Sequence, residues 1–349
     1  MDARSSDTSS ETRSAGHPPA RSGRIGVLLV NLGTPEATSY WPMRAYLKEF
    51  LSDPRVIETN RVLWWVILNG IILTTRPKRS GHAYEKIWNR ERNESPLKTI
   101  TRAQAEGVAA ALAEDPRISV GWAMRYGKPP IADRIAGLKE EGCDRILIFP
   151  LYPQYAAATT ASVMDKAFDA LKVMRWQPTI REVPPYFDDS GHIGALAESV
   201  RTHMAGLKWK PDRIVASFHG LPESYVEKGD PYRDQCEETV RLLRAELGSE
   251  APDLVMTFQS RFGRAEWIKP YTDATVEELA KSGVRNLLVI TPGFAADCVE
   301  TLEEIGIGTR EVFLSNGGEN FSVVPCLNAG GESVLMLTNI VRRELSGWV

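Results

Sequence analysis

Six short apolar runs, separated by segments of helical length, constrain the fold of this chain more than any other feature. Strands that alternate with helices predict βαβ units and a parallel sheet. Each run is apolar almost throughout, as parallel strands buried on both faces require. The predicted strands are Arg24–Val30, Ser119–Met124, Arg145–Pro150, Arg213–Phe218, Leu254–Phe258 and Asn286–Thr291.

Helical patterns fill the intervals, and the strands fall into two sets. The predicted helices are Leu97–Glu114, Pro130–Glu141, Ala157–Met174, Ile193–Leu207, Tyr232–Leu247 and Asp273–Ser282. A stretch rich in turn-forming residues, Val183–Gly191, separates the two sets of strands. We therefore expect an α/β protein of two doubly wound halves, residues 25–182 and 183–325. A last helix, Gly330–Leu345 within residues 326–349, is expected to return to the first half.

Charge and cysteine content exclude several classes of protein. The 349 residues include 42 Lys and Arg against 45 Asp and Glu, a net charge of −3, so the chain lacks the basic surface of a nucleic-acid-binding protein. The four cysteines, Cys143, Cys236, Cys298 and Cys326, are far apart and form no C-x-x-C motif. This spacing argues against a zinc ribbon, an iron–sulfur cluster or a disulfide framework and fits a reducing, cytoplasmic location. Residues 1–24, rich in Ser, Thr, Arg and Pro, predict a disordered tail.

Polar, aromatic and titratable residues gather directly after the predicted strands. In open α/β sheets, ligands bind at the carboxyl ends of the strands, so this pattern predicts a cleft between the two halves. The loop after the first strand has a single glycine and matches neither G-x-G-x-x-G nor G-x-x-x-x-G-K-[ST], which disfavours a dinucleotide or ATP site. The segments concerned are Asn31–Ala37, Arg125–Pro129, Leu151–Tyr155, Ser217–Pro222, Gln259–Gly263 and Pro292–Glu304.

Two of these strand ends carry candidate chemistry. His219 ends a buried strand, where a neutral imidazole can bind a divalent metal or accept a proton; the alternative is a core histidine bonded to backbone. Asp297, Glu300 and Glu304 form an acidic row that could hold a cation or conduct protons. The alternative here is that acidic residues simply favour helix N-termini. Since both features lie at strand ends of one predicted sheet, His219 and Glu300 could face one another.

The most apolar segment of the chain is Val62–Leu73. It has twelve residues, whereas a membrane-spanning helix needs about 20. Trp64 and Trp65, with basic residues on both flanks, suit peripheral contact with a membrane surface. A buried core helix and the wall of a pocket remain alternatives.

The strand-end motifs together resemble those of the ferrochelatase family, which inserts ferrous iron into protoporphyrin IX in the terminal step of haem biosynthesis. They occur in family order from about residue 25 to 345. The matching stretches are Val30–Ala37, Met124–Gly127, Tyr152–Tyr155, Ser217–Pro222, Lys228–Tyr232, Gln259–Gly263 and Phe294–Glu304. The resemblance implies two Rossmann-like halves with parallel sheets facing a central porphyrin cleft. Its expected partners are protoporphyrin IX and Fe²⁺, the latter as substrate, with no permanent cofactor.

The resemblance also implies roles for individual residues. His219 and Glu300 would handle metal and protons, and Glu304 and Asp297 would continue the metal-binding row. Which of these groups handles iron and which handles protons stays open. The residues implied to approach the porphyrin are Leu32, Arg125, Tyr126, Tyr155, Ser217 and Trp267. The helix Tyr40–Leu51 is a further candidate for the cleft wall, although core packing is the better explanation of its apolar residues.

Two departures from the family pattern qualify these expectations. Some members bind a [2Fe–2S] cluster through grouped C-terminal cysteines, and because Cys326 stands alone we expect no cluster. Cys298 lies where some relatives have histidine, so the outer metal route is expected to differ. A chelatase for another metal or ring, such as cobalt or coproporphyrin, and a non-catalytic porphyrin or haem carrier remain alternatives. The sequence gives no indication of the oligomeric state.

Overall fold

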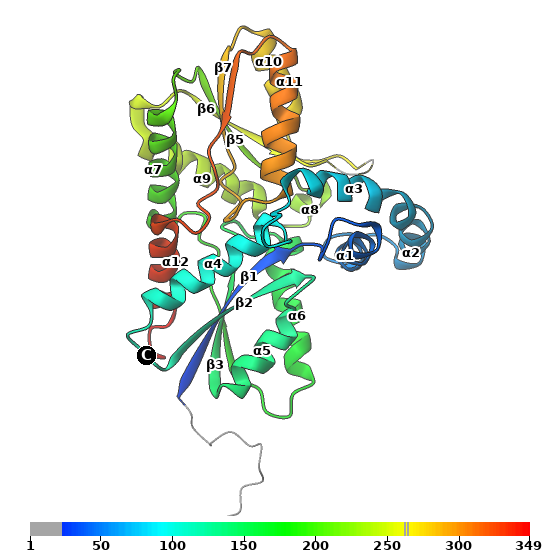
Figure 1. Cartoon of the computed structure of the whole chain (residues 1–349), viewed down its shortest axis with the longest axis vertical. Coiled ribbons are helices and arrows are strands. Elements are labelled where there is room, and N and C mark those ends of the chain that lie inside the picture. The colour runs from blue at the N-terminus through cyan, green and yellow to red at the C-terminus, as the bar shows by residue number, and fades with distance from the viewer. Residues whose placement is uncertain (1–22, 262, 264) are drawn as a thin grey trace, which may run out of the picture.

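The chain forms two four-stranded parallel sheets, as expected of an α/β protein with two doubly wound halves. The computed structural model describes residues 23–261, 263 and 265–349, so nearly all of the predicted tail lies outside the described residues. Figure 1 shows the two sheets one above the other along the long axis of the molecule. All six predicted strands are present, and the fold-class prediction is confirmed.

The N-terminal sheet is built around its first strand. β1 (Arg24–Gly33) lies between β2 (Ile118–Tyr126) and β3 (Cys143–Pro150), and β4 (Thr179–Glu182) pairs with β3. Alternate residues of β1 face opposite sides, so both faces must be covered. One face packs against α4 (Pro96–Ala111) and α12 (Gly331–Glu344). The other packs against α5 (Ile131–Glu140) and α6 (Ser162–Lys172), which continues the π-helix η2 (Ala157–Ala161).

The C-terminal sheet repeats this plan, with strand order β6-β5-β7-β8. Helices α7 (Ser190–Gly206) and α9 (Tyr232–Leu247) cover one face, and α10 (Thr272–Lys281) and α11 (Arg310–Ser315) cover the other. The strands are β5 (Arg213–His219), β6 (Leu254–Gln259), β7 (Asn286–Ile290) and β8 (Asn320–Val323). Short helices α8 (Glu223–Glu227) and η3 (Gly248–Glu250) and the π-helix η4 (Glu300–Thr309) complete this half.

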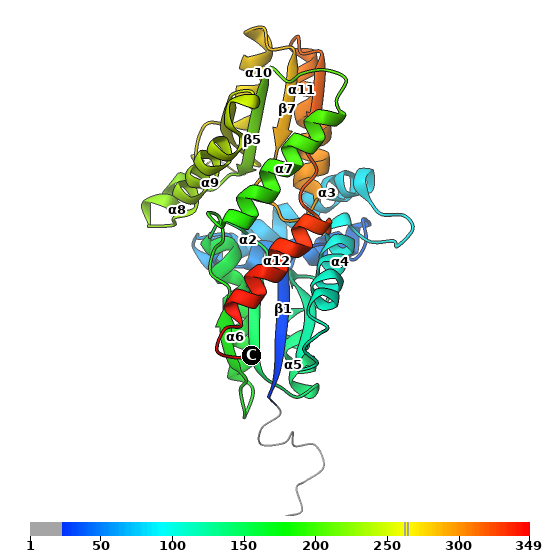
Figure 2. The ribbon, with the colours of Figure 1, turned by 90° about the vertical axis from the view of Figure 1, so that its left-hand side faces the viewer.

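The last helix crosses back to the first half of the molecule. α12 packs against α4 and contributes Met336, Leu337 and Ile340 to the core beneath β1. It also contacts α7, and Figure 2 shows the two helices following one another along the same side of the molecule. The halves are therefore joined both by the connection before α7 and by α12.

A helical insertion separates β1 from α4. It comprises α1 (Tyr40–Ser52), α2 (Arg61–Ile67), the π-helix η1 (Leu68–Ile72) and α3 (Leu73–Ile87), and we call residues 40–87 the lip insertion. Figure 1 shows it projecting to one side where the two halves meet. It has its own apolar core, to which Met43, Leu51 and Trp64 belong. In the described part of the chain, every helix is too short or too polar to span a membrane.

Candidate active site

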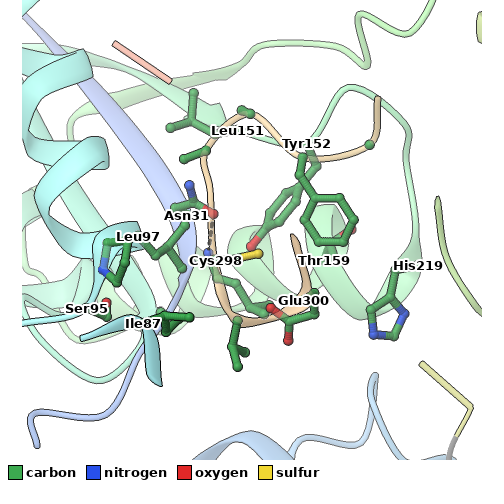
Figure 3. A pocket seen from close by; sticks show the side chains of 18 of the residues that line it. Asn31, Ile87, Ser95, Leu97, Leu151, Tyr152, Thr159, His219, Cys298 and Glu300 are labelled. Carbon is green, nitrogen blue, oxygen red and sulfur yellow. Dashed lines mark hydrogen bonds between the residues drawn. The ribbon is translucent and has the colours of Figure 1, made fainter. Parts of the chain in front are cut away.

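A cavity of about 100 Å³ lies between the two halves and the lip insertion. The carboxyl ends of β1, β3 and β5 and the loop after β7 converge on it, as expected for α/β sheets. Its lining is mainly aromatic and apolar and includes Asn31, Leu32, Tyr46, Tyr84, Leu97, Leu151, Tyr152, His219, Tyr232, Phe294, Cys298 and Glu300. The predicted pair His219 and Glu300 thus lines one cavity, and Figure 3 shows both side chains among those that line it.

His219 has a defined tautomer. It is the last residue of β5, and its Nδ1 lies 2.7 Å from the carbonyl oxygen of Gly220. A carbonyl oxygen can only accept, so Nδ1 carries the hydrogen of the neutral ring. The lone pair is then on Nε2, the atom that can bind a metal or take up a proton.

Glu300 is held in place by Gln259, which is itself bonded to Ser217. The side-chain amide of Gln259 donates from Nε2 to the backbone oxygen of Glu300 at 2.9 Å, and its Oε1 accepts from the Ser217 hydroxyl at 2.8 Å. Ser217, predicted to approach the porphyrin, is fully buried and does not line the cavity. Its hydroxyl instead donates to Gln259, and Gln259 makes the hydrogen bond to the first residue of η4.

The acidic row divides between two cavities. Glu300 lines the first, and Glu304 lines a second cavity of about 400 Å³ together with Ser260, Arg261, Asp273 and other residues. Burial raises the pKa of Glu304, although the Ser260 hydroxyl, 2.5 Å from its carboxylate, and His219 act in the opposite direction. A carboxyl with a raised pKa exchanges protons nearer neutrality, so this group is suited to proton transfer.

Asp297 lies apart from the other acidic residues. Its carboxylate accepts hydrogen bonds from Thr301 Oγ1 at 2.9 Å, Asn328 Nδ2 at 2.7 Å and the backbone N–H of Cys326 at 3.4 Å. It lines neither cavity. Across the described positions, no group of three or more His, Cys, Asp and Glu side chains is arranged to hold a metal ion.

Arg125 and Tyr126 form a buried polar network below the lip insertion. Arg125 makes an ion pair with Asp53, and the Tyr126 hydroxyl donates to Asp53 at 2.8 Å. Burial acts to raise the pKa of Asp53, but hydrogen bonds from Ser162, Arg55 and Tyr126 hold it below its usual value. Of the residues predicted to approach the porphyrin, only Leu32 lines the first cavity; Arg125 and Tyr126 do not.

Tyr155 and Trp267 also lie outside this lining. Tyr155 is half-buried, and its backbone N–H donates to Gln235 at 2.7 Å. Trp267 packs against Gly220, where an added Cβ would lie 3.0 Å from the indole ring and 2.7 Å from the carbonyl oxygen of Gln259. Gly220 therefore permits the close approach of Trp267 to the end of β5.

Sequence reasoning missed several aromatic walls of the cavity. Tyr46 lies in the helix Tyr40–Leu51, which the sequence suggested as a wall of the cleft, and Tyr152 lies in a predicted strand-end segment. The sequence therefore contained an indication that both line the cavity. For Tyr84 it contained none, because α3 contains Pro77 and a run of basic residues that obscure its helical pattern. Burial raises the pKa of both Tyr46 and Tyr84, which keeps their hydroxyls neutral beside Glu300.

The fold and the site together define a class. Two doubly wound halves with parallel sheets are the architecture of the chelatase fold, as two solved structures show. SirB from Bacillus subtilis, solved with Fe³⁺, superposes with a TM-score of 0.57 at 11% identity, covering 93% of this chain and 96% of SirB. CbiX, described as the terminal enzyme of siroheme biosynthesis in denitrifying bacteria, superposes with a TM-score of 0.51 at 17% identity, covering 92% of this chain and all of CbiX. These likenesses show the fold.

Sequence comparison identifies the family within this class. The ferrochelatase family model matches residues 24–345. The ferrochelatase of Agrobacterium fabrum is 58% identical over 335 residues, covering 96% of this chain and 97% of that protein. The ferrochelatase of Rhizobium meliloti is 59% identical, covering 95% and 98%. The chain belongs to the ferrochelatase family.

Proposed function

We propose that this protein inserts Fe²⁺ into protoporphyrin IX, forming protohaem and releasing two protons. The observation that carries the assignment of the site is the cavity lined by both His219 and Glu300. The charges balance, because two pyrrole protons leave as one dication enters. A planar ring shields its own nitrogens, so binding energy from the rest of the macrocycle must distort it. The aromatic lining of the cavity supplies the apolar contacts for that purpose.

His219 and Glu300 are suited to the two ionic parts of the reaction. Nε2 of His219 is free to take a pyrrole proton or to bind the metal, since Nδ1 is engaged by Gly220. The carboxylate of Glu300 can offset the charge of Fe²⁺ or accept the other proton. Glu304, in the second cavity, would pass protons or metal between this pair and the solvent. We assign Asp297 to holding the start of η4, because its oxygens are engaged within the chain.

Iron acts here as substrate, and we propose no permanent cofactor. The four cysteines are buried thiols, one in each of β3 and α9 and two in loops of the second half. We further propose a cytoplasmic protein whose lip insertion contacts the membrane peripherally. Exposed Leu63, Trp65 and Val66 of α2 support this contact.

The roles of His219 and Glu300 are tested by His219→Ala and Glu300→Gln. Each is expected to lower the rate of insertion by at least about 10²-fold, the usual contribution of a positioned acid or base. Absorption spectra of anaerobic mixtures with protoporphyrin and Fe²⁺ or Zn²⁺ give the rate. His82→Ala is the matched control, because His82 is exposed on α3 and makes a surface pair with Glu85. Near-wild-type turnover by a folded His219→Ala or Glu300→Gln variant would remove that residue from the mechanism.

A further inference from the structure

The lip insertion is fastened to the opposite half at the segment before α2. The Tyr225 hydroxyl, from α8, accepts from the backbone N–H of Glu58 at 3.0 Å and donates to the carbonyl oxygen of Val56 at 3.2 Å. Lys228 adds an ion pair with the Glu58 carboxylate at 2.6 Å. Three polar contacts therefore join one short segment of the first half to the second.

The residues directly before Val56 are held within the first half. Asp53, at the end of α1, takes part in the buried network with Arg125 and Tyr126. Arg55 makes a bidentate pair with Asp165 of α6. Asp53 and Arg55 are thus held within the first half, whereas Val56 and Glu58 make their polar contacts with the second half.

The opposite edge of the lip insertion is also joined to the second half. Lys86, near the end of α3, pairs with Glu303 of η4 at 2.8 Å, and Val299 packs against the core of the lip insertion. The cavity is lined by residues from both sides of this junction: Tyr46 and Tyr84 belong to the lip insertion, and His219 and Glu300 belong to the second half.

The cavity is too small for its substrate in this conformation. Its volume is about 100 Å³, whereas sites for ligands of drug size enclose about 300–1,000 Å³. A tetrapyrrole is a ligand of at least that size. A ligand of that size therefore needs more room than this conformation provides.

We propose that Val56 and Glu58 form a clasp with Tyr225 and Lys228 that closes the cleft, and that its opening admits porphyrin and releases product. The ion pair and the Tyr225 hydrogen bonds lie near the surface, so each is weak and the clasp can open within a catalytic cycle. Tyr225 and Lys228 are thus positioning residues, which act through the lip insertion and take no part in the chemistry. The proposal rests on the proposed function only for the identity of the ligand.

The first test is the rate of protoporphyrin binding without metal, followed by stopped-flow porphyrin fluorescence. Tyr225→Phe and Lys228→Met are each expected to raise the association and dissociation rate constants by about two- to fivefold, the effect of losing one exposed pair. Lys281→Met is the matched control, because Lys281 pairs with Glu277 on α10 within one half. Rates within the error of wild type for both clasp variants would overturn the proposal.

The second test locks the clasp. Glu58→Cys/Lys228→Cys, joined by a short bis-maleimide, is expected to bind protoporphyrin at least about tenfold more slowly than the unlinked double variant. Wild type treated with the same reagent is the control, since its four cysteines are buried. Unchanged binding by the cross-linked protein would overturn the clasp. Normal binding kinetics with no iron insertion in wild type would instead contradict the proposed function, so the two failures are distinguishable.

Discussion

Among single residues, His192 at the start of α7 has a polar ring in a position that excludes solvent. Its side chain is buried, with 2% of its surface exposed, and neither ring nitrogen has a hydrogen-bond partner in the described part of the chain. Burial lowers its pKa from 6.5 to about 4, against a small opposing effect of Asp189. The folded state thus binds fewer protons than the unfolded state between these pH values, so stability falls as the pH falls through this range.

This dependence on pH predicts a measurable loss of unfolding free energy in acid. A shift from 6.5 to about 4 corresponds to roughly 3 kcal/mol, at 1.36 kcal/mol per pH unit, lost between pH 6.5 and pH 4. Other groups also titrate there, so the comparison is with His192→Leu, whose stability should fall by roughly 3 kcal/mol less over the same range. Urea unfolding at pH 7 and pH 4.5 measures both proteins. Parallel pH profiles would show that His192 is charged or hydrated in the folded protein.

The hydroxyl of Tyr126 provides a second prediction for a single residue. It donates to Asp53, away from the cavity, so its role in the structure is to support the end of α1. Tyr126→Phe is expected to cost about 1 kcal/mol of unfolding free energy. The KM for porphyrin should stay within about twofold of wild type, because the hydroxyl bonds to Asp53 and Tyr126 does not line the cavity. A several-fold rise in KM at unchanged stability would instead place the hydroxyl in the porphyrin site.

Individual elements differ in how far the sequence predicts them. The six buried strands were predictable because solvent exclusion on both faces demands continuous apolar runs. β4 and β8 were missed because they are short edge strands, Thr-Ile-Arg-Glu and Asn-Phe-Ser-Val, whose position beside β3 and β7 supplies the pairing. The π-helical course of η4 has no sequence signature, so the division of Glu300 and Glu304 between two cavities could not be foreseen.

The apolar segment Val62–Leu73 shows what a side-chain pattern leaves undecided. It forms α2 and η1, and the two adjacent tryptophans have opposite environments. Trp64 is 8% exposed and its indole N–H donates to the Leu51 carbonyl oxygen at 2.6 Å, whereas Trp65 is 66% exposed. Substitution of both would unfold the lip insertion, so a test of membrane contact must spare Trp64.

The membrane prediction therefore concerns the exposed face of α2. Leu63→Glu/Trp65→Glu should reduce co-sedimentation with anionic liposomes and raise the apparent KM for lipid-borne porphyrin by about tenfold with kcat little changed. Burying one large apolar side chain in lipid is worth roughly 1.5–3 kcal/mol. High salt should release the wild type, because the basic flanks are screened.

The control for this experiment also replaces two exposed apolar residues by glutamate, but at another helix. Phe168→Glu/Val173→Glu alters one exposed apolar residue within α6 and one directly after it. The membrane proposal fails if the α2 variant, shown to be folded by circular dichroism, binds liposomes as wild type does. It also fails if the α6 variant loses binding equally.

For the molecule as a whole, the candidate site depends on contacts between segments distant in sequence. His219 and Glu300 were predictable partners because parallel strands of one sheet end at the same edge. Tyr46 and Tyr84 join them only because the lip insertion folds over the cavity mouth. Such packing depends on the three-dimensional path of the insertion, which no periodicity in residues 40–87 encodes.

The last helix makes the clearest whole-molecule prediction, because it follows the second sheet and yet completes the core of the first half. Leu337 of α12 is fully buried beneath β1, whereas Leu335 on the same helix is 53% exposed. Leu337→Ala should cost about 2–5 kcal/mol of unfolding free energy, because it leaves a cavity in that core. Leu335→Ala should change stability by less than about 0.5 kcal/mol. Hydrogen exchange of the β1 and β3 amides locates the effect: lost protection there with Leu337→Ala is expected. If amide protection were lost only in β5–β8, α12 would stabilise the second half instead.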